Sequence, residues 1–272
     1  MNKILHILLW AVLVTMISAS QAFPQDDQPG IGAADLHELS VVTSGGFTAA
    51  YNILAPQFEK ETGIKLITTY GASSGGAPDS IPVRLERGEQ FDIIILSKSS
   101  LTKLTALGLI RPDSLKDLVR SSIGMAVREG VDIPDISSPE LFVETLLDAR
   151  SIGYSASASG TYLSTVLFPG LGLWEQLEPK SERILSERVA AVVARGDVEI
   201  GFQQISEILP YEGVVYVGPI PSKYQKVTTF STGITTRANN AADAQKLIDY
   251  FSSAEVAATI AKTGLEPVIA EN

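Results

Sequence analysis

The stretch Phe91-Asp-Ile-Ile-Ile-Leu96 is almost wholly apolar, which is typical of a central strand in a parallel sheet that is buried on both faces. Two further predicted strands precede it, at residues 39–43 and 64–70, and the residues between them, up to Gly63, repeat their apolar side chains at helical spacing. Strand, helix and strand therefore recur about every 27 residues. This rhythm predicts right-handed crossovers over a mainly parallel sheet that is flanked by helices on both faces.

The same alternation starts again in the second half of the chain. Strands are expected at residues 123–128, 151–154, 198–202 and 227–235. Helices are expected at residues 162–167, 189–194, 241–252 and 254–263. We therefore expect an α/β protein with two lobes, each a mainly parallel sheet flanked by helices, and a ligand cleft between the lobes. Residues 39–120 and 222–272 are expected to form the first lobe, and residues 121–221 the second.

The first 22 residues have the pattern of a secretory signal peptide. Lys3 precedes an apolar run at residues 4–17, and the small side chains of Ser20 and Ala22 suit a signal peptidase. The alternative is a membrane anchor, but the run is shorter than the roughly 20 residues that a spanning helix needs. We expect a secreted, periplasmic protein without stable membrane insertion, in which residues 23–38 form a flexible lead-in.

Composition excludes several classes of site. The formal net charge is −10, and it becomes −11 when the segment with Lys3 is removed, so long-range repulsion argues against nucleic acid as a partner. The chain has no cysteine, which excludes disulfides, thiolate nucleophiles and iron–sulfur ligation. His37 is the one histidine outside the signal peptide, so a histidine-based active site or metal site is not expected.

Two loops rich in glycine and serine follow predicted strands of the first lobe. Ligands of open parallel sheets bind beyond the carboxyl ends of the strands, where the following helices present unpaired N–H groups. Ser44-Gly45-Gly46 could bring main-chain and hydroxyl donors to an anion, although Ser44 could instead cap an ordinary turn. The loop at residues 71–76 repeats this chemistry with Ser73 and Ser74.

A third hydroxyl-rich loop, at residues 155–162, follows a predicted strand of the second lobe and leads into an apolar helix. It would face the first two loops across the cleft. Neither GxGxxG nor GxxxxGK[ST] occurs in these loops, so nucleotide phosphates are not indicated. The expected ligand is a small anion or a polar acid. Tyr162, which ends this loop, and Trp174 are expected in the core or the cleft wall.

Cations and amides complete the candidate site. Arg84 follows the second loop and could hold a carboxylate with both guanidinium nitrogens, although it could also be a solvated helix arginine. Arg195 is expected to interact with the end of its own helix. Consecutive amides at Gln203 and Gln204 leave a predicted strand, and at least one should contact ligand. The candidate substrate-binding residues are Ser44, Gly45, Gly46, Ser73, Ser74, Arg84, Ser157, Ser159, Gly160, Thr161, Tyr162, Gln203 and Gln204.

The order of these segments resembles the type II periplasmic binding-protein fold, in its molybdate-binding-protein-like branch, from residue 39 to about residue 267. The chain departs from the molybdate pattern at two oxyanion contacts. Gly46 stands where that branch has a serine, and Gln204 stands where it has a tyrosine. Molybdate is therefore not the expected ligand.

A more detailed resemblance is to the bacterial aconitate isomerases, a family of secreted enzymes on the same scaffold. It rests on the shared order of six motifs, which are Ser44-Gly-Gly, Ile81-Pro-Val-Arg-Leu85, Met125-Ala-Val-Arg128, Ser157-Ala-Ser-Gly-Thr-Tyr-Leu-Ser164, Val193-Ala-Arg-Gly196 and Gly201-Phe-Gln-Gln204. The loop at residues 72–79 matches least well, and this weakens the assignment of Ser73 and Ser74.

The resemblance implies that the protein interconverts trans-aconitate and cis-aconitate, a tricarboxylate, by an allylic proton shift that needs no cofactor and no metal. Donors must then hold the charge that develops on the carboxylate next to the reacting carbon. The base stays unassigned, and carboxylate, tyrosine, activated serine and water are all open. The alternative function is a non-catalytic receptor that delivers an oxyanion or organic acid to a transporter permease. Fold does not separate the two readings.

Overall fold

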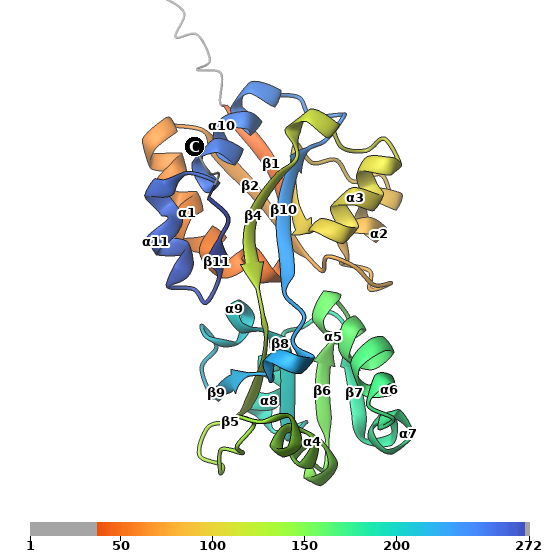
Figure 1. Cartoon of the computed structure of the whole chain (residues 1–272). Coiled ribbons are helices and arrows are strands. Elements are labelled where there is room, and N and C mark those ends of the chain that lie inside the picture. The colour runs from red at the N-terminus through yellow and green to blue at the C-terminus, as the bar shows by residue number, and fades with distance from the viewer. Residues whose placement is uncertain (1–36, 270–272) are drawn as a thin grey trace, which may run out of the picture. The chain divides into compact units, whose positions relative to one another are not determined.

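The computed structural model describes residues 37–269, and its chain folds around two β-sheets with helices against both faces of each (Figure 1). The predicted signal peptide lies outside these residues, as does the predicted lead-in up to residue 36. The expected α/β class with two sheets is confirmed. Within residues 37–269, no helix combines the length and the apolar character that crossing a bilayer requires.

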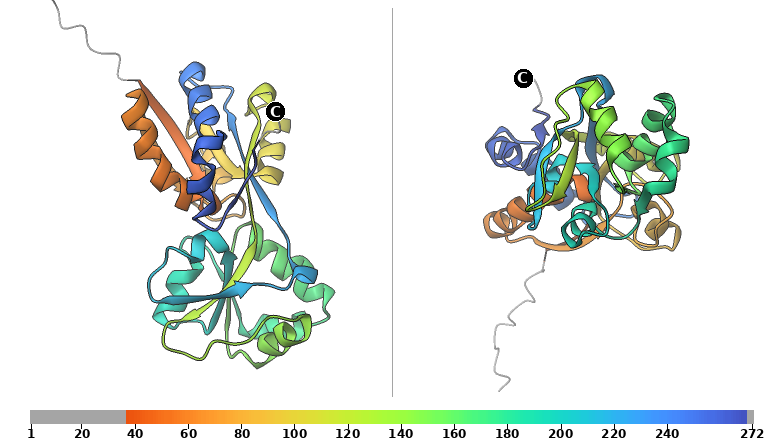
Figure 2. Two further views of the ribbon diagram at one scale, coloured as in Figure 1. Left: turned by 60° about the vertical axis from the view of Figure 1, so that its left-hand side comes forward. Right: turned by 90° about the horizontal axis from the view of Figure 1, so that it is seen from below.

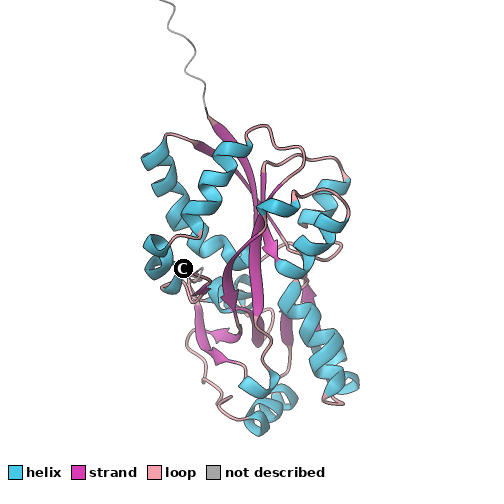
Figure 3. Ribbon diagram, turned by 45° about the horizontal axis from the view of Figure 1, so that its top comes forward, coloured by secondary structure: helices cyan, strands magenta, loops and turns pink. Residues whose placement is uncertain are grey.

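The first sheet has six strands in the order β11-β4-β10-β3-β1-β2. These strands are β1 (Glu38–Ser44), β2 (Lys65–Gly71), β3 (Ile93–Ser97), β4 (Lys116–Ser121), β10 (Thr228–Ile234) and β11 (Glu266–Pro267). Its helices are α1 (Gly45–Thr62), α2 (Ile81–Glu86), α3 (Lys98–Ala106), α10 (Ala241–Phe251) and α11 (Ala254–Ala261). Figures 2 and 3 show the strands of this sheet between the two groups of helices.

The apolar run that led the sequence analysis lies at the centre of this sheet. Side chains of β3 alternate between its faces, so that Ile93 and Ile95 pack with α1, α10 and α11, while Ile94 and Leu96 pack with α2 and α3. All four are fully buried. Burial on both faces explains why this strand needs apolar residues at consecutive positions.

The second sheet has five strands in the order β7-β6-β8-β5-β9. These strands are β5 (Ile123–Arg128), β6 (Ile152–Ser155), β7 (Ser181–Ile184), β8 (Ile200–Gln204) and β9 (Val214–Pro219). Its helices are α4 (Pro139–Asp148), α5 (Ala158–Tyr162), α6 (Phe168–Gly170), α7 (Trp174–Leu177), α8 (Val189–Arg195) and α9 (Ile205–Ile208). A π-helical turn, Leu163–Leu167, joins α5 to α6, and short 3₁₀ turns occupy Pro112–Ser114, Glu178–Lys180 and Ser222–Tyr224.

Both sheets are mixed, and the expectation that each is mainly parallel needs correction. β1 pairs in parallel with β2 and β3, and β6 with β7 and β8, whereas every other pairing between strands is antiparallel. The cause is that the chain leaves the first sheet along β4 into β5 and returns along β9 into β10. Neighbouring strands that carry the chain out and back must run in opposite directions. The lobe boundaries expected at 120/121 and 221/222 stay a prediction.

Candidate functional site

Residues that border both sheets line a hollow of about 200 Å³, which we call the cleft. The helix starts that follow β1, β6 and β8 all reach it, as the rule for carboxyl ends of strands predicts. The polar, glycine and aromatic side of its lining includes Gly45, Gly46, Thr48, Tyr70, Asp79, Ser157, Ser159, Ser186, Glu187, Arg188, Gln203, Gln204, Glu207 and Phe230. Six of the predicted residues are therefore in this lining, and Ser44 directly precedes Gly45.

The first glycine loop is pressed against the opposite wall of the cleft. A Cβ atom on Gly45 would overlap the carboxylate of Glu207, and one on Gly46 would overlap the ring of Phe230. Ser206 Oγ also donates to the carbonyl of Gly46 at 2.8 Å. The two glycines are thus required by close approach of the backbone, and they leave the first N–H groups of the 18-residue helix α1 beside the cleft.

Ser44 ends β1 but does not cap α1, because its side chain makes no hydrogen bond to the first turn of the helix. Ser44 is 1% exposed, and its hydroxyl has no hydrogen-bond partner among the described residues. A buried hydroxyl without a partner costs free energy. This cost makes Ser44 a candidate to bind a ligand in preference to a structural role.

The third loop contributes two serines to the cleft. Ser157 precedes α5 and Ser159 lies in its first turn, where Ser159 Oγ and Ser155 Oγ are 3.0 Å apart. Gly160 packs so tightly on β6 that a Cβ would overlap the backbone of Ser155. Its requirement for glycine is therefore structural.

Thr161 and Tyr162 lie outside the cleft lining. Thr161 is exposed. Tyr162 donates from its hydroxyl to the carbonyl of Tyr224 at 3.0 Å, and Lys226 Nζ lies 5.2 Å from its ring centre. Its ring packs against the core of the second sheet, as does Trp174. Both aromatic residues are half-buried against this core. The role of Tyr162 in substrate binding stays a prediction.

The second loop and Arg84 differ from the prediction most clearly. Ser73 is buried and its hydroxyl accepts a hydrogen bond from the N–H of Ser97 at 3.0 Å. Arg84 donates to the carbonyl of Asp79 at 3.1 Å and to Glu89 at 2.9 Å. Neither these two residues nor Ser74 line the cleft. The expected grouping of Arg84 with the other donors is therefore corrected, because local partners already use its guanidinium.

The cation of the cleft is instead Arg188, which directly precedes α8. It is the one lysine or arginine in the cleft lining that the structure describes. Its Nη1 donates to Glu207 Oε1 at 2.5 Å and to the carbonyl of Gly45 at 3.5 Å. Sequence analysis missed this residue, although its place just before an apolar helix at the end of a strand–loop segment is the signal that could have indicated it.

Glu207 is the other functional side chain that sequence analysis missed. Its side chain is 10% exposed, and Gln203 Nε2 donates to the same Oε1 atom at 2.9 Å. Burial raises the pKa of Glu207 above its ordinary value, while the charge of Arg188 and the hydrogen bonds from Gln203 and Arg188 oppose that change. The spacing of Gln203 and Glu207, four residues apart at the turn from β8 into α9, could have indicated that they point the same way.

The two glutamines have different tasks. Gln203 Oε1 accepts from the N–H of Val189 at 3.0 Å and so caps the start of α8. Gln204 Nε2 donates to Thr228 Oγ1 at 3.3 Å, while its buried Oε1 atom has no partner among the described residues. Gln203 therefore holds the wall of the cleft, and Gln204 keeps a hydrogen-bonding position free for a ligand.

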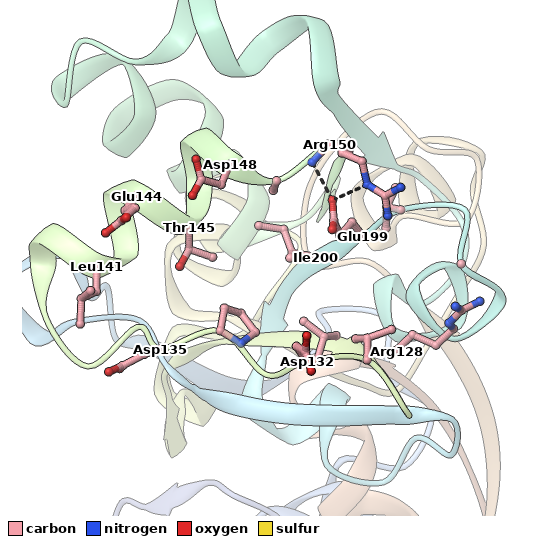
Figure 4. A pocket seen from close by; sticks show the side chains of 16 residues that line it. Arg128, Asp132, Asp135, Leu141, Glu144, Thr145, Asp148, Arg150, Glu199 and Ile200 are labelled. Atoms are coloured by element: carbon pink, nitrogen blue, oxygen red, sulfur yellow. Dashed lines mark hydrogen bonds and ion pairs between the residues drawn. The ribbon is translucent and has the colours of Figure 1, made fainter.

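A larger hollow, of about 600 Å³, lies beside α4 and the second sheet (Figure 4). None of the predicted site residues lines it. Its charged lining is Arg128, Asp132, Asp135, Glu144, Asp148, Arg150 and Glu199. Glu199 also accepts from the N–H and Nε atoms of Arg150, at 2.6 and 3.2 Å. We place the candidate site in the cleft, because the predicted residues and the helix starts that follow parallel strands line it and not the larger hollow.

Neither hollow has the donor set of a metal centre. Among residues 37–269, no group of three or more histidine, aspartate or glutamate side chains is arranged to hold a metal ion. His37 lies elsewhere, with its Nδ1 atom 2.6 Å from Asp243 Oδ2.

Comparisons with known proteins identify the family and support the fold. Residues 39–266 match the family model described as bacterial extracellular solute-binding protein. The chain is 41% identical to an aconitate isomerase from Pseudomonas sp, over 89% of this chain and 93% of that protein. It is 23% identical to a molybdate-binding protein of Escherichia coli (strain K12), over 86% of this chain and 91% of that protein. The periplasmic molybdate-binding protein of Azotobacter vinelandii has a TM-score of 0.69 at 21% identity, covering 86% of this chain and all of that one.

Proposed function

Because the chain belongs to the family of bacterial extracellular solute-binding proteins and, within it, is related to an aconitate isomerase, we propose that it interconverts trans-aconitate and cis-aconitate in the cleft. The observation that carries the proposal is the 41% identity to that isomerase over nearly the full length of both chains. Identity to the molybdate-binding relative is 23%, which supports only a distant relationship.

The reaction moves one proton along a three-carbon unit. A base removes a proton from the methylene carbon of aconitate, and the electron pair spreads over the double bond and the neighbouring carboxylate. A proton then returns to the other terminal carbon, so that the double bond changes place and geometry. No electron is gained or lost, and therefore the step itself requires no redox cofactor.

The cleft offers donors for the carboxylates of such a substrate. The N–H groups at the start of α1 stand beside Gly45 and Gly46, and an anion there interacts favourably with the helix dipole. Hydroxyl groups of Ser157 and Ser159 face the same hollow, and Arg188 supplies a full positive charge. We propose that these residues, together with Ser44 and Gln204, bind the tricarboxylate.

We further propose that the protein works in the periplasm, after cleavage of a signal peptide at residues 1–22. Support comes from the extracellular family and from the apolar run behind Lys3. N-terminal sequencing of the protein recovered from a periplasmic extract tests this directly, and a chain that still begins at Met1 would contradict it.

A direct assay tests the enzymatic function. Purified protein is incubated with trans-aconitate between pH 5 and pH 9, and the products are separated by chromatography. We expect cis-aconitate to accumulate to a fixed ratio that is also reached from the opposite direction. Absence of any cis isomer over this pH range would overturn the proposal.

The second candidate is a receptor that binds an organic acid or oxyanion without changing it, and the similarity to molybdate-binding proteins favours it. When the ligand concentration is 100 times the dissociation constant, such a receptor gains about 2.7 kcal/mol in its free energy of unfolding. A thermal-shift screen with molybdate, sulfate and tricarboxylates detects this gain. Stabilisation by an acid that is recovered unchanged would favour the receptor, whereas conversion of aconitate favours the isomerase.

A further inference from the structure

The reaction needs a group that removes a proton from carbon, and the cleft contains one carboxylate that is both buried and directed at the anion-binding backbone. We propose that Glu207 carries the proton between the two terminal carbons of aconitate, and that Arg188 leaves Glu207 to bind a carboxylate of the substrate. This inference rests on the proposed isomerase function and adds to it the identity of the base.

The position of Glu207 suits this role. Its carboxylate lies so close to Gly45 that a Cβ atom there would overlap it, so it stands at the start of α1, where a substrate carboxylate is expected. A base must lie within hydrogen-bonding reach of the carbon whose proton it takes, next to the donors that stabilise the developing charge. A substrate carboxylate bound at the start of α1 would bring the neighbouring carbon next to Glu207.

The other carboxylates of the cleft have different partners. Asp79 accepts a hydrogen bond from Ser186 Oγ at 3.0 Å. This bond joins the loop after β2 in the first sheet to the loop after β7 in the second. Glu187 forms two hydrogen bonds with Arg195, at 2.9 and 3.2 Å, and these lower its pKa. A carboxylate with a lowered pKa is a weaker base. Burial raises the pKa of Glu207 above its ordinary value, which is opposite to the change in Glu187.

The pair with Arg188 couples binding to basicity. Arg188 is the charged group in contact with Glu207. The side chain of Gln203 and the N–H of Gln204, at the end of β8, also donate hydrogen bonds to Glu207, and Gly45 of α1 lies against it. Asp79 and Glu187 are the remaining charges of the cleft lining. When Arg188 turns to a substrate carboxylate, Glu207 loses the positive charge that lowers its pKa. Its pKa then rises toward the working pH, where a general base is most effective.

The same carboxylate can complete the reaction. In the first step, the methylene C–H bond breaks and an O–H bond forms on Glu207, while the electron pair enters the allylic system. In the second step, that O–H bond breaks and a C–H bond forms at the other terminal carbon. The protein ends in its starting state, with no net uptake of protons or electrons.

The test compares Glu207→Gln with Glu144→Gln, which makes the same chemical change on the exposed side of α4. We measure the isomerisation rate, the exchange of methylene hydrogens in ²H₂O, and the dissociation constant for trans-aconitate by calorimetry. Glu207→Gln is expected to lower kcat and exchange about 100-fold to 10,000-fold, with the dissociation constant changed less than about tenfold. Glu144→Gln should match the wild type within about twofold.

Retention of more than a tenth of the wild-type rate by Glu207→Gln would overturn the inference, and so would persistent methylene exchange. If that variant does not fold, Glu207→Asp serves instead, because it keeps the charge but withdraws the carboxylate by one carbon–carbon bond. An unchanged rate in Glu207→Asp would also overturn the inference. Both results concern only Glu207, since a wild-type protein that does not isomerise aconitate would instead remove the proposed function.

Discussion

Two loops of similar composition follow neighbouring parallel strands of the first sheet, and they have different uses. In the loop after β1, Ser44-Gly45-Gly46, the buried hydroxyl of Ser44 has no partner among the described residues and does not cap α1. The loop after β2, at residues 71–80, uses its polar groups internally, since Ser73 accepts from Ser97 N–H and Ser80 Oγ donates to the carbonyl of Gly75 at 3.0 Å. Composition is alike, but the buried serine of the second loop, Ser73, has a partner in the protein, whereas Ser44 of the first loop has none among the described residues.

Each loop also has an arginine–glutamate pair nearby, and the pairs differ in the same way. Arg84 and Glu89 are partly exposed, with side chains 22% and 34% accessible, and the arginines lower the pKa of Glu89. Arg188 and Glu207 lie in the cleft, where burial raises the pKa of the carboxyl. The two pairs differ in their carboxylates and not in their arginines, because Glu207 is 10% accessible whereas Arg188, at 32%, is as exposed as Arg84 or more so.

The largest expected difference is between Arg188→Ala and Arg84→Ala. Loss of Arg188 removes the charge that we expect to pair with a substrate carboxylate and leaves Glu207 buried without its cation, so kcat/KM should fall by about 30-fold to several thousand-fold, equivalent to 2 to 5 kcal/mol. Arg84→Ala removes a partly exposed pair and should change kcat/KM less than about twofold. Steady-state kinetics with trans-aconitate measures both, and a reversed order would return Arg84 to the site.

The second comparison is between the glycines. In Gly46→Ala the new methyl group meets the buried ring of Phe230, and we expect a loss of about 1 to 3 kcal/mol in the free energy of unfolding. Gly76→Ala is the control, because a Cβ at Gly76 meets no atom within 4 Å. Its effect should stay within about 0.5 kcal/mol. Urea denaturation of both variants measures these values, and equal stabilities would show that the first loop is less tightly packed than described.

The serines offer a third comparison, with a smaller effect. Ser73→Ala leaves the N–H of Ser97 buried without an acceptor and should destabilise the protein by about 1 to 3 kcal/mol. Ser44→Ala removes a buried hydroxyl that has no partner among the described residues, so stability should stay unchanged or rise, by up to about 1 to 3 kcal/mol. Binding of trans-aconitate should nevertheless weaken in Ser44→Ala. Calorimetry and urea denaturation on the two variants separate the roles, and unaltered binding in Ser44→Ala would remove Ser44 from the site.

The smallest expected effect is on the pH dependence of stability, to which Glu207 and Glu89 should contribute with opposite signs. The pKa of Glu207 is raised in the folded state, so its contribution to stability is full below the ordinary pKa of 4.5 and is lost as the pH rises through the raised value. The pKa of Glu89 is lowered, chiefly by hydrogen bonds from Arg87 and Arg84, so its contribution is present above 4.5 and is lost as the pH falls.

Urea unfolding of the wild type, Glu207→Gln and Glu89→Gln over a pH series checks this sign. The stability advantage of the wild type over Glu207→Gln should decrease as the pH increases from 4.5. Its advantage over Glu89→Gln should decrease as the pH decreases from 4.5. The same slope in both series would contradict the contrast between the buried and the exposed pair.

Sequence patterns predicted the elements with strong local signals. The strands expected at 39–43, 64–70 and 123–128 correspond to β1, β2 and β5, and the helix that ends at Gly63 is α1. β4 was not predicted, because Lys116, Asp117 and Arg120 interrupt its apolar pattern. Its burial depends on β10, a strand more than 100 residues away, so no local pattern in the sequence identifies it.

The candidate site divides in the same way. Donor-rich helix starts were predicted at Gly45, Gly46, Ser157 and Ser159, because loops that follow parallel strands lie at the ligand-binding edge of such sheets. Arg84 was chosen because it lies next to a glycine loop in the chain, and Arg188 was not considered. Arg188 is distinguished by its contacts with Glu207, 19 positions away in the sequence, and with Gly45, 143 positions away.

By itself the sequence determined the α/β class, the strands buried on both faces and the helix starts that meet at one edge of each sheet, because these follow from side-chain periodicity and from glycines placed between strand and helix. Only the tertiary structure decided which charged groups face the cleft and which neutralise one another elsewhere. The physical reason is that periodicity is a property of neighbouring residues, whereas desolvation and charge pairing depend on every group that folding brings within a few ångströms.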